Sequence, residues 1–210
     1  IEAGFDGVEL HGANTYLLQQ FFSPHSNRRD DEWGGTLEKR FSFIDKLVDE
    51  VTATVDESGA ENFIVGYRFS PEENPGIRFT DTLFLVDQLA DKGLDYLHIS
   101  LRDRQLVSVS ENHKEKSMLA YIHEQINGRV PLVGVGDVRT SEDAEQVLEN
   151  SELVAVGRAL LIDPHWGAKA LDKKDDLIRQ EISNYDREEL FLANGVWGFM
   201  EFMMPDRLGK

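Results

Sequence analysis

A histidine, an asparagine and a tyrosine stand close together after the first apolar run of the chain. The stretch FDGVELHGANTY places His11, Asn14 and Tyr16 directly after residues 5–10, which have the composition of a buried strand. An imidazole and a carboxamide there can both donate hydrogen bonds to one carbonyl oxygen, and each such donor stabilises a developing negative charge by roughly 2.7–4 kcal/mol. We therefore predict that His11 and Asn14 bind a substrate oxygen.

Tyr16 is the candidate proton donor of this group. A phenol that delivers a proton to a reacting atom accelerates a reaction by roughly 10²- to 10⁴-fold. The alternative, which the spacing leaves open, is that a histidine or tyrosine at a strand end is only a hydrogen-bonded structural residue.

Arg68 lies in the second apolar run, VGYRF. An unpaired buried charge is costly, so this guanidinium needs a partner. The partner could be a structural carboxylate, an electron-rich ligand ring or an oxyanion. His98 and Ser100 close the third run, where we favour a packing role over a place in the same site.

Two glycine-containing turns follow the later apolar runs. GVGD contains Gly136, and VGRALLIDP contains Gly157 and Arg158. Glycine lets the backbone approach a ligand, and the amides of a following short helix can face an anion. Two such loops on adjacent strands match the phosphate site of barrel enzymes, so we predict that these three residues bind a phosphate. The alternative is that they form ordinary turns.

The elements that must position these residues alternate between short apolar runs and longer amphipathic segments. Strands are expected at residues 5–10, 62–70, 94–100, 130–136 and 153–157, and helices at 36–55, 80–92, 117–126, 140–148 and from 158. The expected helix N-caps are Thr36, Thr80 or Asp81, and Thr140 or Ser141. Apolar strands separated by helices favour a parallel sheet covered on both faces, in either a doubly wound fold or a barrel.

The chain is expected to divide near residue 170. Residues 1–170 hold the five strand-helix units, and residues 171–210 form a C-terminal helical extension rich in Phe, Met and Trp.

Composition excludes several classes of function. The 22 Lys and Arg residues against 39 Asp and Glu residues give a net charge of −17, which repels phosphate backbones and anionic lipid, so we predict neither a nucleic-acid nor a membrane partner. The chain has no cysteine, which removes thiolate metal sites and catalytic thiols and fits a cytoplasmic location. The spacing of the six histidines indicates no metal site.

The stretch FDGVELHGANTYLLQQFFSPHSNRRDDEWGGTLEKRFSF resembles the signature of the Old Yellow Enzyme family of FMN-dependent NAD(P)H oxidoreductases. The pieces VGYRFSPEE, DYLHISL, VPLVGVGD and LVAVGRALLIDP continue in the order of that family, up to about residue 170. Thr15 and Lys39 depart from the usual glycine and asparagine. The resemblance implies a TIM (β/α)8 barrel, of which this chain would be a partial barrel covering strands 4 to 8.

The resemblance also implies roles for the candidate residues. His11 and Asn14 would bind the substrate oxygen over the flavin, Tyr16 would protonate the α carbon, and Arg68 would face the pyrimidine edge of FMN. Gly136, Gly157 and Arg158 would hold its phosphate. The implied reaction is that of an ene-reductase, in which hydride passes from NADH or NADPH through FMN to a small α,β-unsaturated carbonyl compound.

The resemblance implies further that three strand-helix units precede residue 1 and that the chain is a fragment. We therefore expect the 210 residues alone to be inactive and to bind FMN weakly or not at all. We also expect a homo-oligomer, because a partial barrel leaves a strand edge unpaired and apolar surface uncovered.

Two alternatives remain. A phosphate-binding barrel enzyme acting on a small phosphorylated metabolite would bind phosphate without flavin. A non-catalytic folding or interaction fragment is favoured by the apolar tail.

Overall fold

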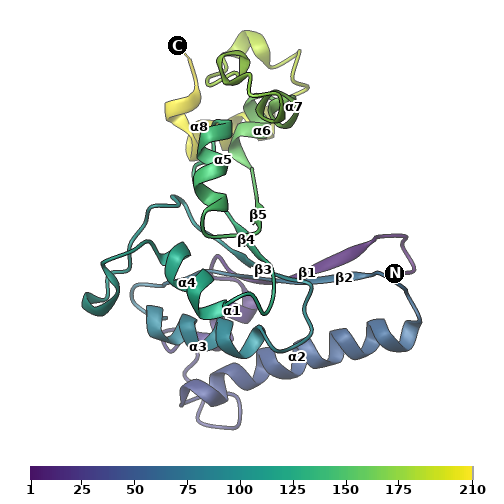
Figure 1. Cartoon of the computed structure of the whole chain (residues 1–210), viewed down its shortest axis with the longest axis vertical. Coiled ribbons are helices and arrows are strands. Elements are labelled where there is room, and N and C mark those ends of the chain that lie inside the picture. Colours follow the sequence, from purple (N-terminus) through teal and green to yellow (C-terminus); the bar gives the residue numbers. More distant parts are fainter. Residues whose placement is uncertain (210) are drawn as a thin grey trace. The chain divides into compact units, whose positions relative to one another are not determined.

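The computed structural model describes residues 1–209, whose five strands form one parallel sheet (Figure 1). The strands are β1 (Gly7–Gly12), β2 (Ile64–Phe69), β3 (Tyr96–Ile99), β4 (Leu132–Gly134) and β5 (Leu153–Val154). They are hydrogen-bonded in the order β1-β2-β3-β4-β5, and every neighbouring pair is parallel. The parallel α/β class is confirmed, and the strand order lacks the reversal that a doubly wound sheet has at its switch point.

The described residues form two compact units. The first unit contains Ile1–Gly136 and Val147–Val154 and therefore the whole sheet. The second unit contains Asp137–Gln146 and the chain from Ala155 onward. The expected division near residue 170 stays a prediction.

Three helices of the first unit lie along one side of the sheet (Figure 1). They are α2 (Leu37–Ser58), α3 (Phe79–Leu89) and α4 (Met118–Ile126). Alternate residues of the central strands supply the buried layer of the sheet, namely Val65, Tyr67, Phe69, Leu97 and Ile99. Because side chains alternate along a strand, the residues between them point to the opposite face.

That opposite face, called here the polar face, carries titratable side chains. Strand register places Glu9 beside Gly66 and His11 beside Arg68 on the first two strands. The same register continues into β3, where Tyr96 pairs with Gly66 and His98 with Arg68. The polar face consists of Glu9, His11, Arg68, Tyr96 and His98.

The two ends of helix α2 are set by residues of the types that favour helix caps. The Thr36 hydroxyl accepts a hydrogen bond from the Lys39 amide at 3.4 Å, which confirms Thr36 as the N-cap. Gly59 ends the helix in the left-handed region with φ 68°. Ile44 and Val48 are fully buried, as helical spacing requires of the face that packs on the core.

Helix α3 begins earlier than predicted. Its N-cap is Arg78, so the prediction of Thr80 or Asp81 is wrong. Asp81 instead lies inside the first turn, 2% exposed, and its carboxylate accepts a hydrogen bond from the Arg78 guanidinium at 2.7 Å. An aspartate in the first turn also interacts favourably with the helix dipole. Helix α3 ends at Leu89 and not at Lys92.

The remaining described helices have between five and ten residues. Helix α1 (Leu17–Phe22), which the sequence reading missed, belongs to the first unit, and α6 (Arg158–Ile162), α7 (Trp166–Leu171) and α8 (Asn194–Met203) belong to the second. Helix α5 (Ser141–Leu148) has Thr140 as its cap, because the Thr140 hydroxyl accepts from the Asp143 amide at 3.1 Å. Short 3₁₀ turns occupy Glu111–His113, Asp175–Leu177, Asn184–Asp186 and Pro205–Arg207.

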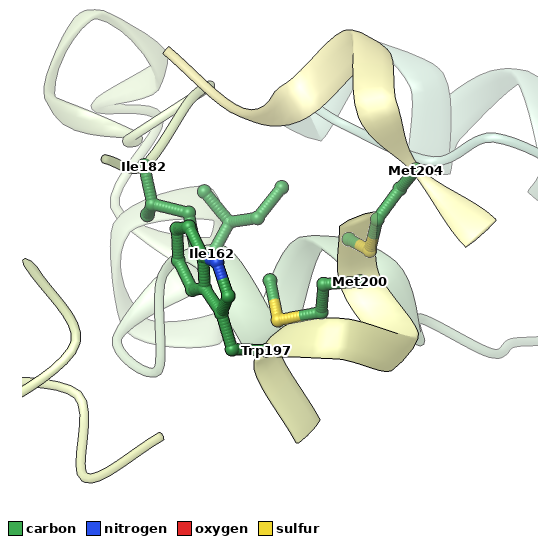
Figure 2. Packing of buried hydrophobic residues seen from close by; sticks show 5 residues of the cluster. All are labelled: Ile162, Ile182, Trp197, Met200 and Met204. Atoms are coloured by element: carbon green, nitrogen blue, oxygen red, sulfur yellow. The ribbon is translucent and has the colours of Figure 1, made fainter. Parts of the chain in front are cut away.

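The C-terminal segment supplies most of the core of the second unit. The buried cluster consists of Ile162, Ile182, Trp197, Met200 and Met204, and Figure 2 shows these side chains pointing toward one another. Within the predicted extension of residues 171–210, the described residues are helical in α8 and in three 3₁₀ turns. Residue 210 of the predicted extension lies outside the described residues. Within residues 1–209, no helix combines the length and the apolar character needed to cross a membrane.

Candidate active site

The predicted donors lie where β1 and β2 end. His11 is the next-to-last residue of β1, and its neighbour across the sheet is Arg68. Tyr16 is the N-cap residue of α1, and its ring centroid lies 5.0 Å from that of His11. The Tyr16 side chain is 61% exposed, so its hydroxyl is accessible to a ligand. His11, Tyr16 and Arg68 therefore gather at the carboxyl edge of the sheet, where parallel α/β proteins bind their ligands.

Asn14 is joined to Arg68 through one side chain. The Arg68 Nη2 donates to the Ser100 hydroxyl at 3.1 Å, and that hydroxyl donates to Asn14 Oδ1 at 3.0 Å. The backbone N–H of Asn14 donates to the Ser70 hydroxyl at 2.9 Å. Asn14 is thus held at both its backbone and its side chain.

The environment of His11 favours its neutral form. Burial lowers its pKa below the ordinary value of 6.5, and the positive charge of Arg68 lowers it further. Glu9 opposes this shift, and His98 adds to it. A neutral imidazole at pH 7 keeps one N–H donor without adding a second positive charge beside Arg68.

Glu9 is the hydrogen-bond acceptor at the centre of the polar face. Its Oε2 accepts from the Tyr96 hydroxyl at 3.1 Å and lies 2.8 Å from His98 Nδ1. Gly66 makes this contact possible, because a Cβ at that position would overlap the Tyr96 ring. The ring therefore crosses β2 over a residue that has no side chain.

Two polar atoms of this face are buried without a partner. Among residues 1–209, no hydrogen-bond partner reaches Nε of Arg68 or Nε2 of His98. An orphaned buried guanidinium nitrogen is costly unless a ligand acceptor completes it. Arg68 therefore fits a site for a ligand that offers acceptor atoms, such as the edge of a flavin ring.

The loop of residues 23–36 has a structural role. Asn27 Nδ2 donates to the carbonyl oxygens of Phe21 and Trp33, at 2.6 and 2.7 Å. The buried Arg40 donates to the carbonyls of Phe22 and Gly35 at 2.8 and 2.5 Å. These bonds tie the loop to α1 and α2. Much of the sequence signature therefore shapes the segment after Tyr16 and does not itself face the site.

The two predicted phosphate loops are joined by an ion pair. Arg158 Nη2 lies 3.1 Å from Asp137 Oδ1, and Asp137 directly follows Gly136. Burial alone would raise the pKa of Asp137, but the hydrogen bond and charge of Arg139 and the charge of Arg158 hold it below its ordinary value. Gly157 is the N-cap residue of α6, with open space where a Cβ would stand.

Gly136 is needed for a different reason. Its φ is +143°, and a Cβ there would overlap the backbone of Arg104. Gly136 belongs to the first unit and Gly157 and Arg158 to the second. Their joint role as a phosphate site stays a prediction, as do the roles of His11, Asn14 and Tyr16.

Sequence reasoning missed the supporting residues. Ser70, Ser100 and Glu9 each contact a predicted site residue or its neighbours, but a serine directly after a strand and a glutamate within one are common and carry little signal. The position of Ser100 directly after β3 was the available clue, and the packing role that we favoured for it understates its contacts. In the described part of the chain, no group of three or more His, Asp or Glu side chains is placed to hold a metal ion.

A parallel sheet with polar side chains gathered at its carboxyl edge defines an α/β protein whose ligand site lies at that edge. The NADH:flavin oxidoreductase / NADH oxidase family model matches residues 1–176, and the chain belongs to this family. The resemblance of the signature is thereby confirmed. The expected flavin cofactor and NADH reductant are those of the family.

Two curated relatives and one solved structure show the extent of the similarity. The chain is 45% identical to a Bacillus subtilis protein named probable NADH-dependent flavin oxidoreductase YqiG, over 94% of this chain and 54% of the relative. It is 42% identical to the NADH:acrylate oxidoreductase of Vibrio harveyi, over 98% of this chain and 21% of the relative. The structure of morphinone reductase in complex with tetrahydroNAD superimposes with a TM-score of 0.64 and 27% identity, covering 82% of this chain and 45% of that protein. The chain thus spans about half the length of the first relative and about a fifth of the second.

Proposed function

We propose that the protein containing this chain is an FMN-dependent oxidoreductase of the ene-reductase type, which reduces α,β-unsaturated carbonyl compounds with NADH or NADPH. The observation that supports this most is the gathering of His11, Tyr16 and the Arg68-linked Asn14 at the carboxyl edge of the sheet. Similarity to morphinone reductase supports a carbonyl compound as substrate.

His11 and Asn14 form the proposed oxygen site. A neutral imidazole N–H and a carboxamide N–H can both donate to one carbonyl oxygen, which polarises the conjugated double bond. These donors act more strongly as negative charge develops on the oxygen, so they stabilise the transition state more than the bound substrate.

Tyr16 is the proposed general acid. Its hydroxyl would protonate the substrate carbon next to the carbonyl. Its exposed position at the start of α1, with its ring 5.0 Å from that of His11, supports a place on the ligand side of the imidazole.

Arg68, Gly136, Gly157 and Arg158 are the proposed FMN-binding residues. The orphaned Nε of Arg68 fits an acceptor atom of the flavin ring, and its charge would favour negative charge on that ring. The open space at Gly157 and the guanidinium of Arg158 fit a phosphate group. FMN, once reduced, supplies the hydride for the substrate β carbon.

We propose further that the five strands are the fourth to eighth of a (β/α)8 barrel and that the active protein is longer than this chain. Strands β1 and β5 are the edges of the sheet described for residues 1–209. Val8 lies in β1 and is 41% exposed, and Phe5, two residues before the strand, is 72% exposed. An open edge beside exposed apolar side chains favours association with another strand, so the 210 residues alone should self-associate. They should bind FMN weakly or not at all, because the first three strand-helix units of the barrel would contribute part of the flavin site.

The proposal is tested in a protein that includes the sequence upstream of residue 1. We expect it to purify with FMN and to reduce cyclohexenone with NADH or NADPH. The variant Tyr16→Phe should lose roughly 10²- to 10⁴-fold in turnover while it still binds FMN. The matched control Tyr185→Phe removes the hydroxyl of a tyrosine that is 96% exposed in the second unit, and it should keep full activity.

The same experiment separates the alternatives. Phosphate binding without flavin would replace the proposal with an enzyme of phosphorylated metabolites. A longer protein that neither binds flavin nor turns over would favour a non-catalytic role.

A further inference from the structure

We propose that Ser100 is a positioning residue that turns the Asn14 side chain so that its NH₂ group faces the ligand, and that it couples Asn14 to Arg68. The inference rests on the proposed function for the identity of the ligand. It rests on the hydrogen bonds of residues 14, 68 and 100 for the orientation of the amide.

The direction of each hydrogen bond follows from the chemistry of the three groups. A guanidinium has only donors, so the Ser100 oxygen must accept the 3.1 Å bond from Arg68 Nη2. The single hydroxyl hydrogen then needs an acceptor, and Asn14 Oδ1 provides one at 3.0 Å. A flipped amide would bring two donors to one serine oxygen and leave the hydroxyl hydrogen without this acceptor.

The backbone of Asn14 is fixed independently of its side chain. Asn14 has φ 55° and Thr15 has φ 65°, both in the left-handed region. The Asn14 N–H donates to Ser70 Oγ at 2.9 Å, and the Thr15 N–H donates to Gln19 Oε1 at 3.0 Å. With the backbone held in this way, the remaining freedom of Asn14 is rotation of its side chain, which Ser100 restricts.

The consequence is that the oxygen end of the amide is occupied and the NH₂ end is available. A substrate carbonyl accepts hydrogen bonds and donates none, so only this orientation allows Asn14 to bind it. A hydroxyl that accepts from a cation is polarised into a stronger donor, so the charge of Arg68 reinforces the orientation. Ser100 therefore links the residue proposed for the flavin to a residue proposed for the substrate.

The amide orientation is tested first by NMR in the FMN-containing protein that carries this chain, labelled with ¹⁵N-asparagine. The variant Asn14→Asp assigns the side-chain NH₂ pair of Asn14. We expect Ser100→Ala to shift this pair and to make its two protons exchange faster with water. The control Ser110→Ala removes a hydroxyl from the loop after β3 and should leave the pair unchanged.

Ligand binding is tested second with cyclohexenone as the probe. Ser100→Ala should weaken the affinity of the protein for cyclohexenone by about fivefold to tenfold, the size expected for one hydrogen bond. Ser100→Thr keeps the hydroxyl and should retain the wild-type affinity. In an Asn14→Ala background, Ser100→Ala should cause no further loss, because Ser100 acts through Asn14.

Two results would overturn the inference. One is an Asn14 NH₂ pair that is the same in wild type and Ser100→Ala. The other is a loss from Ser100→Ala that is equal in the presence and absence of the Asn14 amide. Failure of the wild-type protein to bind cyclohexenone would contradict the proposed function instead, and the NMR result would still decide the amide orientation.

Discussion

The carboxylate of Glu9 lies 2.8 Å from Nδ1 of His98, across the strand that separates them. An ionised carboxylate only accepts, so His98 donates from Nδ1. The same carboxylate oxygen accepts the hydroxyl of Tyr96. The Glu9 carboxylate is therefore the acidic group of the polar face, on which His11 and Arg68 also lie.

Removing that charge should lower the pKa of His11. Burial and Arg68 already hold this pKa below 6.5, and Glu9 is the group that raises it. Glu9→Gln should therefore shift it further down, as measured by NMR titration of the His11 ring. Glu61→Gln, which neutralises an exposed carboxylate, is the control. An upward shift in Glu9→Gln would show that the sign of this interaction is wrong.

The same substitution should lower the pKa of Tyr96. Burial, together with the charge and hydrogen bond of Glu9, raises the pKa of Tyr96 to about 12. Without the carboxylate charge, the phenolate is less disfavoured, so ionisation should move toward the ordinary value of 10.0. Ultraviolet titration of Glu9→Gln against wild type, with Tyr96→Phe to identify the signal, measures the change. Identical titration curves would contradict it.

The low pKa of His11 should make stability depend on pH. The unfolded chain binds a proton near the ordinary value of 6.5, whereas the folded chain binds it only at lower pH. The unfolded state therefore holds more protons in that interval, and the free energy of unfolding should fall as the pH drops below about 6.5. His11→Asn should reduce the fall, as measured by urea denaturation across this range. Equal slopes in the two proteins would rule out a contribution from His11.

Gly66→Ala should disrupt the contact between Tyr96 and Glu9. The added Cβ would overlap the Tyr96 ring, and such overpacking typically costs about 1–3 kcal/mol of stability. We expect lower stability in chemical denaturation and a Tyr96 pKa closer to 10.0. Gly198→Ala is the control, because open space surrounds that position in helix α8. A Gly66→Ala protein as stable as wild type would show that the Tyr96 ring does not need the space above Gly66.

Met200→Ala should destabilise the second unit. Met200 is fully buried against Trp197 and Ile162, so its truncation leaves a cavity worth about 2–5 kcal/mol. Phe202→Ala, on the same helix but 82% exposed, should cost far less. Hydrogen exchange of the α8 amides measures both effects. Equal protection in the two variants would show that this cluster does not hold α8.

Local rules predicted the elements well where one residue carries the signal. Thr36 was predicted as a cap, and Thr140 as one of two candidates beside Ser141, because a hydroxyl directly ahead of an amphipathic segment favours an N-cap. The start of α3 was predicted wrongly because an aspartate is favoured both at the N-cap and in the first turn. In the structure the buried Asp81 carboxylate accepts from the exposed Arg78 side chain, and Asp81 lies in the first turn. Helix α1 was missed because its six residues are too few to show a period.

The site was predictable to the extent that its residues lie at the carboxyl ends of strands or directly after them. His11 and Arg68 were readable because their strands are contiguous apolar runs, and the register then makes them neighbours. Ser100 and Glu9 were not, because their contacts bridge residues more than 80 positions apart in the chain. We expected a parallel sheet covered on both faces, and the composition of the strands did not show that side-chain alternation on β1, β2 and β3 gathers titratable side chains on one of these faces.

Because residue 66 is a glycine with no side chain, it restricts which substitutions this sequence can accept in evolution. The Tyr96 ring fills the space above Gly66 and ends on Glu9, so none of the three can be replaced without affecting the other two. Natural variants should therefore alter positions 66 and 96 together or leave both alone. A larger residue at 66 should be found only beside a smaller one at 96, and such a lineage should still keep the acid at 9, because that carboxylate also contacts His98.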